Sequence, residues 1–251
     1  DSAEPDDQET PPAPERPPFV GPATFSESSA IIGFCAVHDT IYGNMEIRGS
    51  TLSSLNDLDC LRRVNGNLTI LASSLTTIRL TQLQAVTGNV FISGTTIATA
   101  VQFPALEQIG GNLVIGGGST LSNLLVIDAS RLLSIGGDLR LEDTRSLAVA
   151  ELPALRHIGR HLWVRRNEAM TSVMIPQVTS LGGALRVESC GSLTEVGLSG
   201  LVQVGAAMTA ELAIERNGAL RDLNGLHAVR SVSGPLSIRR NPALPDATAR
   251  A

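Results

Sequence analysis

The chain repeats one arrangement of hydrophobic and polar positions. An apolar residue precedes a short turn, and two apolar residues separated by one position follow, as in VNGNLTI (64–70) and IGGDLRL (135–141). The spacing is 22 to 27 residues, and the first apolar residue of each pair is Met45, Leu68, Val90, Leu113, Leu139, Leu162, Leu185, Leu212 or Leu236. A period in this range is typical of solenoids, in which each repeat forms one coil.

Further apolar positions recur inside each repeat. In the repeat that begins at Leu185 they are Val187, Leu193, Val196, Leu201 and Val204. We interpret them as inward-facing positions on successive sides of a coil, so that stacked coils form ladders of like side chains. The strands would be parallel and about 4.8 Å apart. The pattern therefore predicts an all-β protein, a single solenoid of about nine coils, with a leucine-rich-repeat horseshoe as the alternative.

Small polar residues and glycines mark the predicted corners. Glycine pairs such as Gly110-Gly111, Gly136-Gly137 and Gly182-Gly183 precede the predicted main strand, and we expect a positive φ there. Asn residues follow the strand and are expected to turn the next corner and bond to neighbouring coils: Asn167, Asn217 and Asn241.

Two repeats are longer than the others. About three residues are added near Ile127, over residues 127–131, and about four near Met208, over residues 208–211. Insertions in solenoids form loops that project from the stack. These loops are therefore additional candidates for a functional surface.

The composition refines this fold. Of the 251 residues 43% are hydrophobic but only 3% aromatic, which suits thin aliphatic layers. The formal net charge of −5 comes from the first 22 residues, which hold six acids and only Arg16, so the remainder is neutral and offers no electrostatic footprint for nucleic acid. The domain prediction is a disordered, acidic, Pro-rich leader or stalk (1–30), the solenoid (31–246) and a tail (247–251). The sequence has no transmembrane run, and we interpret the stalk as a spacer from a possible membrane anchor upstream of residue 1.

Residues 35–70 carry a more specific resemblance. Cys35 is followed by Met45-Glu46-Ile47, by residues 52–58 in the place of a short amphipathic helix, by Cys60 and then by Gly66-Asn67-Leu68-Thr69-Ile70. This order resembles the start of a receptor L domain, the leucine-rich β-helical module of insulin- and epidermal-growth-factor-type receptor ectodomains, and the likeness extends over about residues 35–244. It implies a right-handed parallel β-helix, a short N-terminal capping helix, a Cys35–Cys60 disulfide and a binding role. The Cys-rich module, kinase and second disulfide of the receptors are missing, so receptor signalling is not implied.

A Cys35–Cys60 disulfide would place the protein in an oxidising compartment, either secreted or at a cell surface or in a periplasm. Three cysteines leave Cys190 over. We expect it to be a structural thiol at a turn, with an intermolecular or reactive thiol as the alternative.

The sequence contains no nucleophile motif, no metal site and no cofactor motif. His157 and His161 are expected at a corner rather than on a helix. Carboxylates gather at Asp138, Glu142 and Asp143, beside Arg140, Arg165 and Arg166. β-Helical polysaccharide lyases and hydrolases need clustered acids and bases, but a salt-bridged surface ladder explains this cluster better.

The strand period places two columns of side chains on the outer face of the main sheet. Trp163, the only Trp, should lie between Arg140 and Arg186 of adjacent coils, where cation–π stacking would hold it. The candidate ligand-binding residues are Leu71, Phe91, Val114, Arg140, Trp163, Arg165 and Arg186. The sequence thus predicts a non-enzymatic extracellular or cell-surface binding or adhesion module for a protein, or less favourably a glycan. The alternatives are a β-helical polysaccharide enzyme and a structural spacer in which Trp163 only shields its own sheet.

Overall fold

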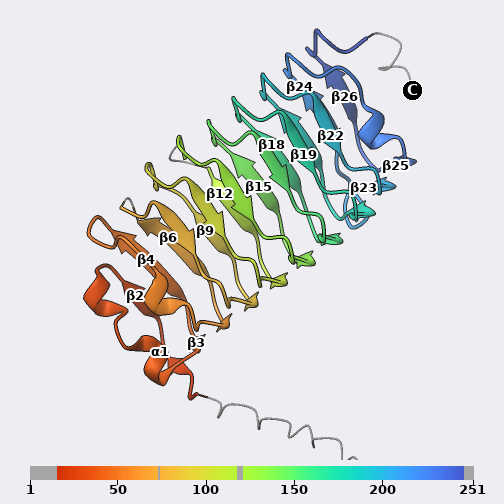
Figure 1. Cartoon of the computed structure of the whole chain (residues 1–251). Coiled ribbons are helices and arrows are strands. Elements are labelled where there is room, and N and C mark those ends of the chain that lie inside the picture. The colour runs from red at the N-terminus through yellow and green to blue at the C-terminus, as the bar shows by residue number, and fades with distance from the viewer. Residues whose placement is uncertain (1–15, 73, 118–120, 246–251) are drawn as a thin grey trace, which may run out of the picture.

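The protein is a β-solenoid of about nine turns, seen in a computed structural model that describes residues 16–72, 74–117 and 121–245 (Figure 1). Each turn contributes one strand to the main sheet, the ten-stranded parallel sheet that carries the predicted apolar pairs. Its strands, in spatial order, are β2 (Ala23–Phe25), β4 (Met45–Gly49), β6 (Leu68–Ala72), β9 (Val90–Ile92), β12 (Leu113–Gly116), β15 (Leu139–Glu142), β18 (Leu162–Arg165), β21 (Leu185–Glu188), β24 (Leu212–Glu215) and β26 (Leu236–Arg239).

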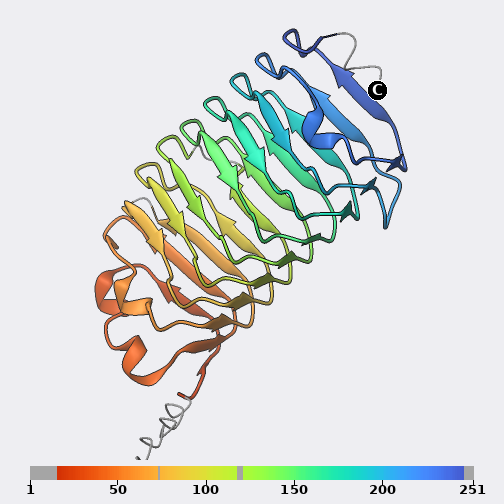
Figure 2. The same cartoon turned by 45° about the vertical axis from the view of Figure 1, so that its right-hand side comes forward.

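A second ten-stranded parallel sheet forms the adjacent side of the coils (Figure 2). It consists of β1 (Phe19–Val20), β3 (Thr40–Tyr42), β5 (Arg63–Val64), β8 (Ala85–Val86), β11 (Gln108–Ile109), β14 (Ser134–Ile135), β17 (His157–Ile158), β20 (Ser180–Leu181), β23 (Gln203–Val204) and β25 (Ser231–Val232). Two three-stranded sheets form the third side: β7 (Thr77–Arg79), β10 (Ala100–Gln102) and β13 (Val126–Asp128), then β16 (Val149–Glu151), β19 (Ser172–Met174) and β22 (Glu195–Gly197).

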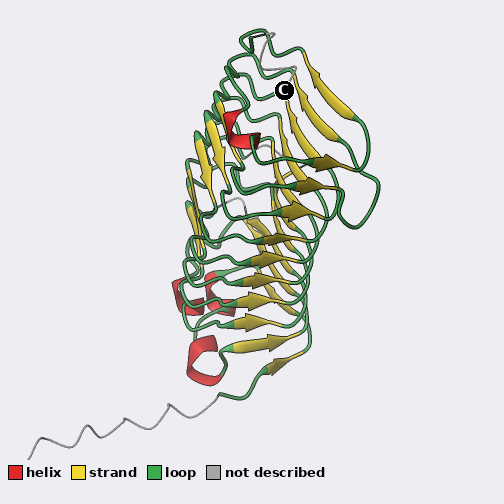
Figure 3. Cartoon of the chain, turned by 90° about the vertical axis from the view of Figure 1, so that its right-hand side faces the viewer, coloured by secondary structure: helices red, strands yellow, loops and turns green. Residues whose placement is uncertain are grey.

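Short helices lie at the two ends of the stack (Figure 3). The α-helix α1 (Phe34–Val37) and the 3₁₀ turns η1 (Ser28–Ala30) and η2 (Asn56–Leu58) belong to the N-terminal end, and η3 (Asn224–Leu226) lies near the C-terminal end. A short N-terminal helix is thus present as α1, while residues 52–58, the position given by the resemblance, contain only the 3₁₀ turn η2. Phe34 of α1 is buried and packs edge-on against Phe25, with ring centroids 5.9 Å apart. This aromatic cluster covers the first coil.

The predicted register of the main sheet is confirmed at every coil. The nine residues that open the apolar pairs form eight consecutive Cα pairings, from Met45↔Leu68 to Leu212↔Leu236. Their inward side chains join one continuous aliphatic core, in which Leu68, Leu139 and Leu185 are fully buried. The apolar period therefore fixes which residues stack.

The solenoid starts earlier than the predicted boundary at residue 31. β1 pairs with β3, and β2 pairs with β4 in the same register as the later coils. The stretch from Val20 to Phe25 follows the repeat, with Gly21-Pro22 as the turn, and Ala23 and Phe25 point into the core. The stalk prediction is therefore wrong for the segment containing these strands, while residues 1–15 and the predicted tail 247–251 lie outside the described residues.

The glycines before the main strand have a different role from the predicted positive φ. Gly136 has no left-handed backbone; a Cβ on it would instead lie 2.2 Å from the carbonyl oxygen of Gly110 in the preceding coil. The described non-glycine residues with positive φ, such as Asp143 and Arg166, all follow a main strand; before the strands a left-handed φ occurs at Gly21, Gly43 and Gly205 and not at the predicted pairs. Glycine is needed before the strand because consecutive coils approach closely there.

The prediction for the corner asparagines is confirmed. The fully buried Asn167 accepts hydrogen bonds from the N–H (3.0 Å) and hydroxyl (2.8 Å) of Thr144, and its amide donates to the carbonyl of Leu141 (2.9 Å). Asn217 and Asn241 make equivalent bonds to their neighbouring coils. These side chains supply the partners that buried backbone groups need.

The two insertions fall at different corners. Because Val101 pairs with Ile127, the extra residues near Ile127 precede it and lie between β12 and β13, not over residues 127–131 as predicted. The second insertion lies between β23 and β24, over residues 205–211, in agreement with the prediction near Met208. This loop borders the outer face of the main sheet, where the candidate site lies.

Candidate functional site

Trp163 occupies the middle of the main sheet and is half-buried on its outer face. The strand register places it between Arg140 and Arg186, as predicted. The guanidinium carbons of Arg140, Arg165 and Arg186 lie 4.1, 4.7 and 5.9 Å from the indole centroid. The sequence pattern anticipated two of these cation–π contacts; the third comes from Arg165 on the same strand.

His161, which was expected at a corner, supports the indole from the position just before Leu162 of the strand. Its ring stacks on Trp163 at 5.4 Å with an interplanar angle of 30°. Its Nδ1 accepts the N–H of Ala184 at 2.8 Å, so in this arrangement the proton of the neutral ring is on Nε2. The ring orientation of Trp163 is thus fixed by a side chain that is itself bonded to the next coil.

A column of polar side chains explains why His161 takes this position. Asn44, Asn67, Asn89, Asn112 and Asp138 stand just before successive main strands, and each side-chain oxygen accepts a backbone N–H from the following coil. His161 continues this column. The signal was readable in the sequence as an Asn immediately before each of the first four apolar pairs.

The carboxylates around Trp163 are engaged in ion pairs. Asp138 contacts Arg140 at 2.6 Å, Glu142 contacts Arg165 at 2.9 Å, and Asp143 contacts Arg166 at 2.7 Å. The hydrogen bond from Arg166 holds the pKa of Asp143 below its ordinary value. The expected salt-bridged ladder is therefore present, and it gives the arginines fixed positions around the indole.

Ion pairing also changes which outward positions are exposed. Glu142 and Glu215 occupy outward strand positions, but each is about 95% covered, because Arg165 and Arg239 of the following coil fold over them. Ser93, Gly116 and Ala213 of the same outward columns are buried as well. The alternation along a strand predicts whether a side chain points outward. It does not predict whether a long side chain of the next coil buries it.

The loop 205–211 forms a wall beside Trp163. A shallow depression of about 410 Å³ is lined by His161, Trp163, Ala184, Arg186, Thr209, Ala210, Glu211 and Pro235. Arg186 on β21 connects the sheet to this loop through an ion pair and a hydrogen bond with Glu211. Two features considered separately in the sequence, the Trp163 face and the second insertion, therefore belong to one site.

The remaining candidate residues extend from this site along the sheet. Phe91 and Val114 precede Arg140 and Trp163 in the same column and are half-buried. Leu71 is 39% exposed and lies in the next outward column, in register with Arg48. The structure thus puts Phe91, Val114, Arg140, Trp163 and Arg186 in one row, with Leu71 and Arg165 beside it.

The cysteines are arranged as the resemblance implied. Cys35 and Cys60 form a disulfide with Cα atoms 5.6 Å apart, which is consistent with an oxidising compartment. Cys190 is fully buried, and burial raises the pKa of its thiol to about 11. Since the thiolate is the reactive form, this environment opposes the reactive alternative for Cys190.

The described residues also bear on metal binding and on membrane insertion. They contain no group of three or more His, Cys, Asp or Glu side chains arranged to hold a metal ion. Every helix among them is too short to span a bilayer.

Comparison with known proteins identifies no relative of this chain. The chain matches no family model, and no curated protein or solved structure is significantly similar to it. The resemblance to the receptor L domain therefore stays a prediction from residues 35–70.

Proposed function

We propose that this protein is a non-enzymatic, secreted or surface-displayed binding module. In this proposal the outer face of the main sheet recognises a protein ligand, with Trp163 as the central contact and the loop 205–211 as one border. The observation that carries it is the half-buried Trp163, fixed by three arginines and His161 beside an open depression.

The physical basis is the low entropy cost of using this indole. Trp and Arg are enriched at the residues that dominate protein interfaces, and rigid side chains lose little freedom on binding. Here Arg140 and Arg186 are already ordered by Asp138 and Glu211, so a ligand would meet a preorganised surface. Trp163 Nε1 is buried and has no hydrogen-bond partner among the described residues, so the contribution of the indole is apolar and cation–π in character.

The enzyme alternative is less well supported by the same residues. A glycosidase requires a carboxylic acid with a raised pKa beside a second carboxylate. Asp138 and Glu142 are bound to arginines, and the pKa of Asp143 is lowered. The lowered pKa of Asp143 disfavours it as a proton donor, and the other two carboxylates are already occupied by ion pairs.

The test is capture of a partner from the extracellular and surface fractions of the source organism. The bait is the immobilised chain, compared with the double variant Trp163→Ala/Phe91→Ala and with Tyr42→Ala as control. Tyr42 is 51% exposed on the second sheet, so its removal tests loss of an aromatic ring away from the site. All baits must first show equal unfolding midpoints.

The proposal expects a protein retained by wild type and Tyr42→Ala and lost by the double variant. Retention by all three would remove the Trp163 face as the site. A glycan retained in place of a protein would establish the second ligand class. Turnover of a polysaccharide would establish the enzyme, and the absence of any partner would favour the spacer.

A further inference from the structure

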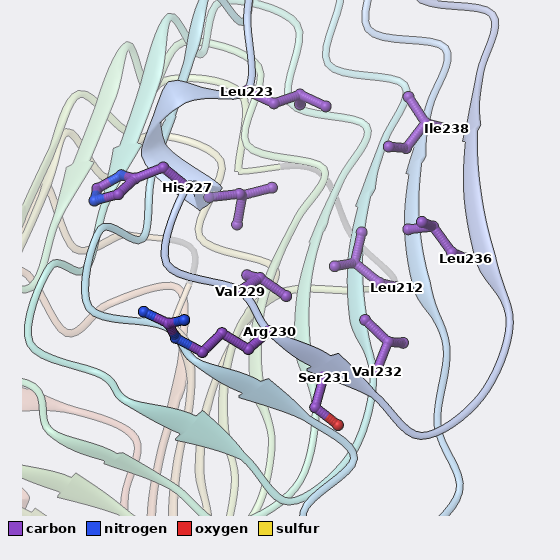
Figure 4. Close-up of a pocket in the computed structure, with 10 residues that line it drawn as sticks. Leu212, Leu223, His227, Val229, Arg230, Ser231, Val232, Leu236 and Ile238 are labelled. Atoms are coloured by element: carbon purple, nitrogen blue, oxygen red, sulfur yellow. The ribbon is translucent and has the colours of Figure 1, made fainter. Parts of the chain in front are cut away.

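The two ends of the solenoid are finished differently. At the N-terminal end α1, the Cys35–Cys60 disulfide and the Phe25–Phe34 contact cover the first coil. At the C-terminal end the last coil is open, and a cavity of about 310 Å³ is lined largely by partly exposed apolar side chains: Leu223, Leu226, Val229, Val232, Leu236 and Ile238. In Figure 4 Leu212, Val232, Leu236 and Ile238 border one space, and Arg230 and His227 point away from it. Leu236 is 61% exposed, the largest value among the leucines of this coil.

The last strand of the main sheet also has backbone groups that no other described residue bonds. Leu212 donates its N–H to the carbonyl of Pro235 (3.0 Å), and Arg216 donates to that of Arg239 (3.2 Å). In a parallel pair alternate residues face the neighbour, so residues 235, 237 and 239 face β24. The N–H and C=O groups of Leu236 and Ile238 therefore point to the open edge, where a further strand can pair.

The segments outside the described residues are poorly suited to cover this end. Residues 1–15 and 246–251 contain no Leu, Ile, Val, Phe or Met. An apolar surface of this kind needs an apolar surface opposite it, and the C-terminal coil of another molecule has one.

We propose that two copies of this chain associate end to end through their last coils, with the two β26 strands paired antiparallel about a two-fold axis at Ser237. This register places Leu236 opposite Ile238 of the second copy, so each such pair exchanges both of its free backbone hydrogen bonds. Because this axis is perpendicular to the main sheet, the core-facing sides of both copies lie on the same side of the joined sheet. The inward side chains of Leu236 and Ile238 then meet over the open core.

The charges of β26 fit this register. The guanidinium of Arg239 is paired with Glu215 at 2.9 Å, and this contact lowers the pKa of Glu215. The two Arg239 residues lie at opposite ends of the paired segment, four residues or about 13 Å apart along the strands. Ser237, which is opposite its own symmetry mate, is uncharged.

The association would join the two main sheets into one surface. Both Trp163 residues would then face the same direction, separated by seven strand steps, or about 34 Å. A ligand with repeated sites could engage both copies at once.

The first test is the sedimentation of the full chain across the micromolar range, in oxidising buffer. We expect a monomer–dimer equilibrium. Leu236→Gln should raise the dimer Kd about 100-fold, because two exposed leucines lose their cover. Ser237→Lys should raise it about fivefold, since two like charges stand opposite each other. Thr69→Lys is the control, because Thr69 is also an outward strand residue whose register partner is a glutamate, Glu46.

Both β26 variants retain the monomer fold in this account. Leu236 is largely exposed, and the ammonium group introduced by Ser237→Lys would lie beside the carboxylate of Glu215. Equal unfolding midpoints for the four proteins, measured at concentrations where all are monomeric, check this. A wild-type chain that stays monomeric throughout would overturn the proposal. So would a dimer whose Kd is changed as much by Thr69→Lys as by the β26 variants.

The second test locates the contact by cross-linking. Residues opposite each other in a non-hydrogen-bonded antiparallel pair have Cα atoms about 4.5 Å apart, within the range of a disulfide. Mild oxidation of Ser237→Cys should give a covalent dimer, and Thr69→Cys should not; Cys190 is buried and does not compete. A chain that dimerises but whose Ser237→Cys variant does not cross-link would place the interface elsewhere.

Discussion

At the residue scale, Cys190 illustrates how the core controls chemistry. Its thiol lies within a coil, and its backbone N–H donates to Asn217. Burial raises the pKa of the thiol to about 11, because the thiolate would lose its hydration. Cys190, the free cysteine, thus lies in an environment that disfavours the reactive thiolate.

This shift predicts a pH dependence of stability. Between about pH 9 and 11 the unfolded state has lost the Cys190 proton while the folded state keeps it, so stability is full below this window and falls as pH rises through it. The loss should reach about 2–3 kcal/mol at the top of the window. The chain contains no Lys and a single Tyr, so few other side chains titrate in this window.

The measurement is urea unfolding at several pH values, for wild type and Cys190→Ala. We expect the wild-type free energy of unfolding to fall more steeply above pH 9 than that of the variant. Parallel curves would show that the thiol is not protected. Slow reaction of native Cys190 with a thiol reagent would provide an independent check.

Asn167 gives a second prediction at this scale. Replacing it with Ala leaves the N–H of Thr144 and the carbonyl of Leu141 buried without their partner. We expect Asn167→Ala to lower the free energy of unfolding by about 3 kcal/mol. Asn123→Ala is the control, because Asn123 is exposed and makes one bond to the carbonyl of Thr96; its change should stay within about 1 kcal/mol. Equal losses would contradict a special role for the corner asparagines.

At the element scale, the close approach of coils before the main strand can be tested at Gly136. A Cβ there would meet the carbonyl oxygen of Gly110 at 2.2 Å. We expect Gly136→Ala to lower the free energy of unfolding by about 2–3 kcal/mol, because the backbones of two coils must move apart.

The matched substitution is Gly191→Ala, where a Cβ meets no atom within 4 Å and φ is not left-handed. It should leave stability unchanged or raise it by about 0.5 kcal/mol. Urea unfolding of both variants measures the difference. If Gly136→Ala left the free energy of unfolding unchanged, the close approach of the coils would not explain this glycine, and backbone conformation would.

The strands were predictable from the sequence, and several details of the corners were not. The apolar pairs predicted the stacking register of the main sheet because both side chains of each pair must point into the core, each in line with its counterpart in the next coil. The role of Gly136 depends on Gly110, 26 residues away, which no local pattern reveals. The first insertion was misplaced because a period shows only that residues were added; the Val101↔Ile127 pairing shows where.

The candidate site shows the same division. Periodicity placed Trp163 between Arg140 and Arg186. It could not place His161 against the indole, or the loop 205–211 beside it, because these depend on side-chain rotamers and on the path of an irregular segment. The burial of Glu142 beneath Arg165 likewise depends on the rotamer of a long side chain.

At the scale of the whole molecule, the N-terminal cap depends on a covalent link. The Cys35–Cys60 disulfide has a sequence separation of 25. By the chain-entropy relation, its loss in Cys35→Ala/Cys60→Ala should lower the free energy of unfolding by about 3 kcal/mol. Thermal unfolding with and without reductant tests this. Reductant should destabilise wild type and Cys190→Ala and leave the double variant unchanged; an effect of reductant on the double variant would contradict the assignment.

The central claim is that the face around Trp163 is where this molecule binds. The most direct measurement is hydroxyl-radical footprinting of the wild-type chain with and without its captured protein partner. Trp163 and Met208, which is 40% exposed in the bordering loop, should lose reactivity in the complex, and Tyr42 on the second sheet should keep its reactivity. Protection of Tyr42 with unchanged Trp163 and Met208 would place the ligand on another side of the solenoid and contradict the account.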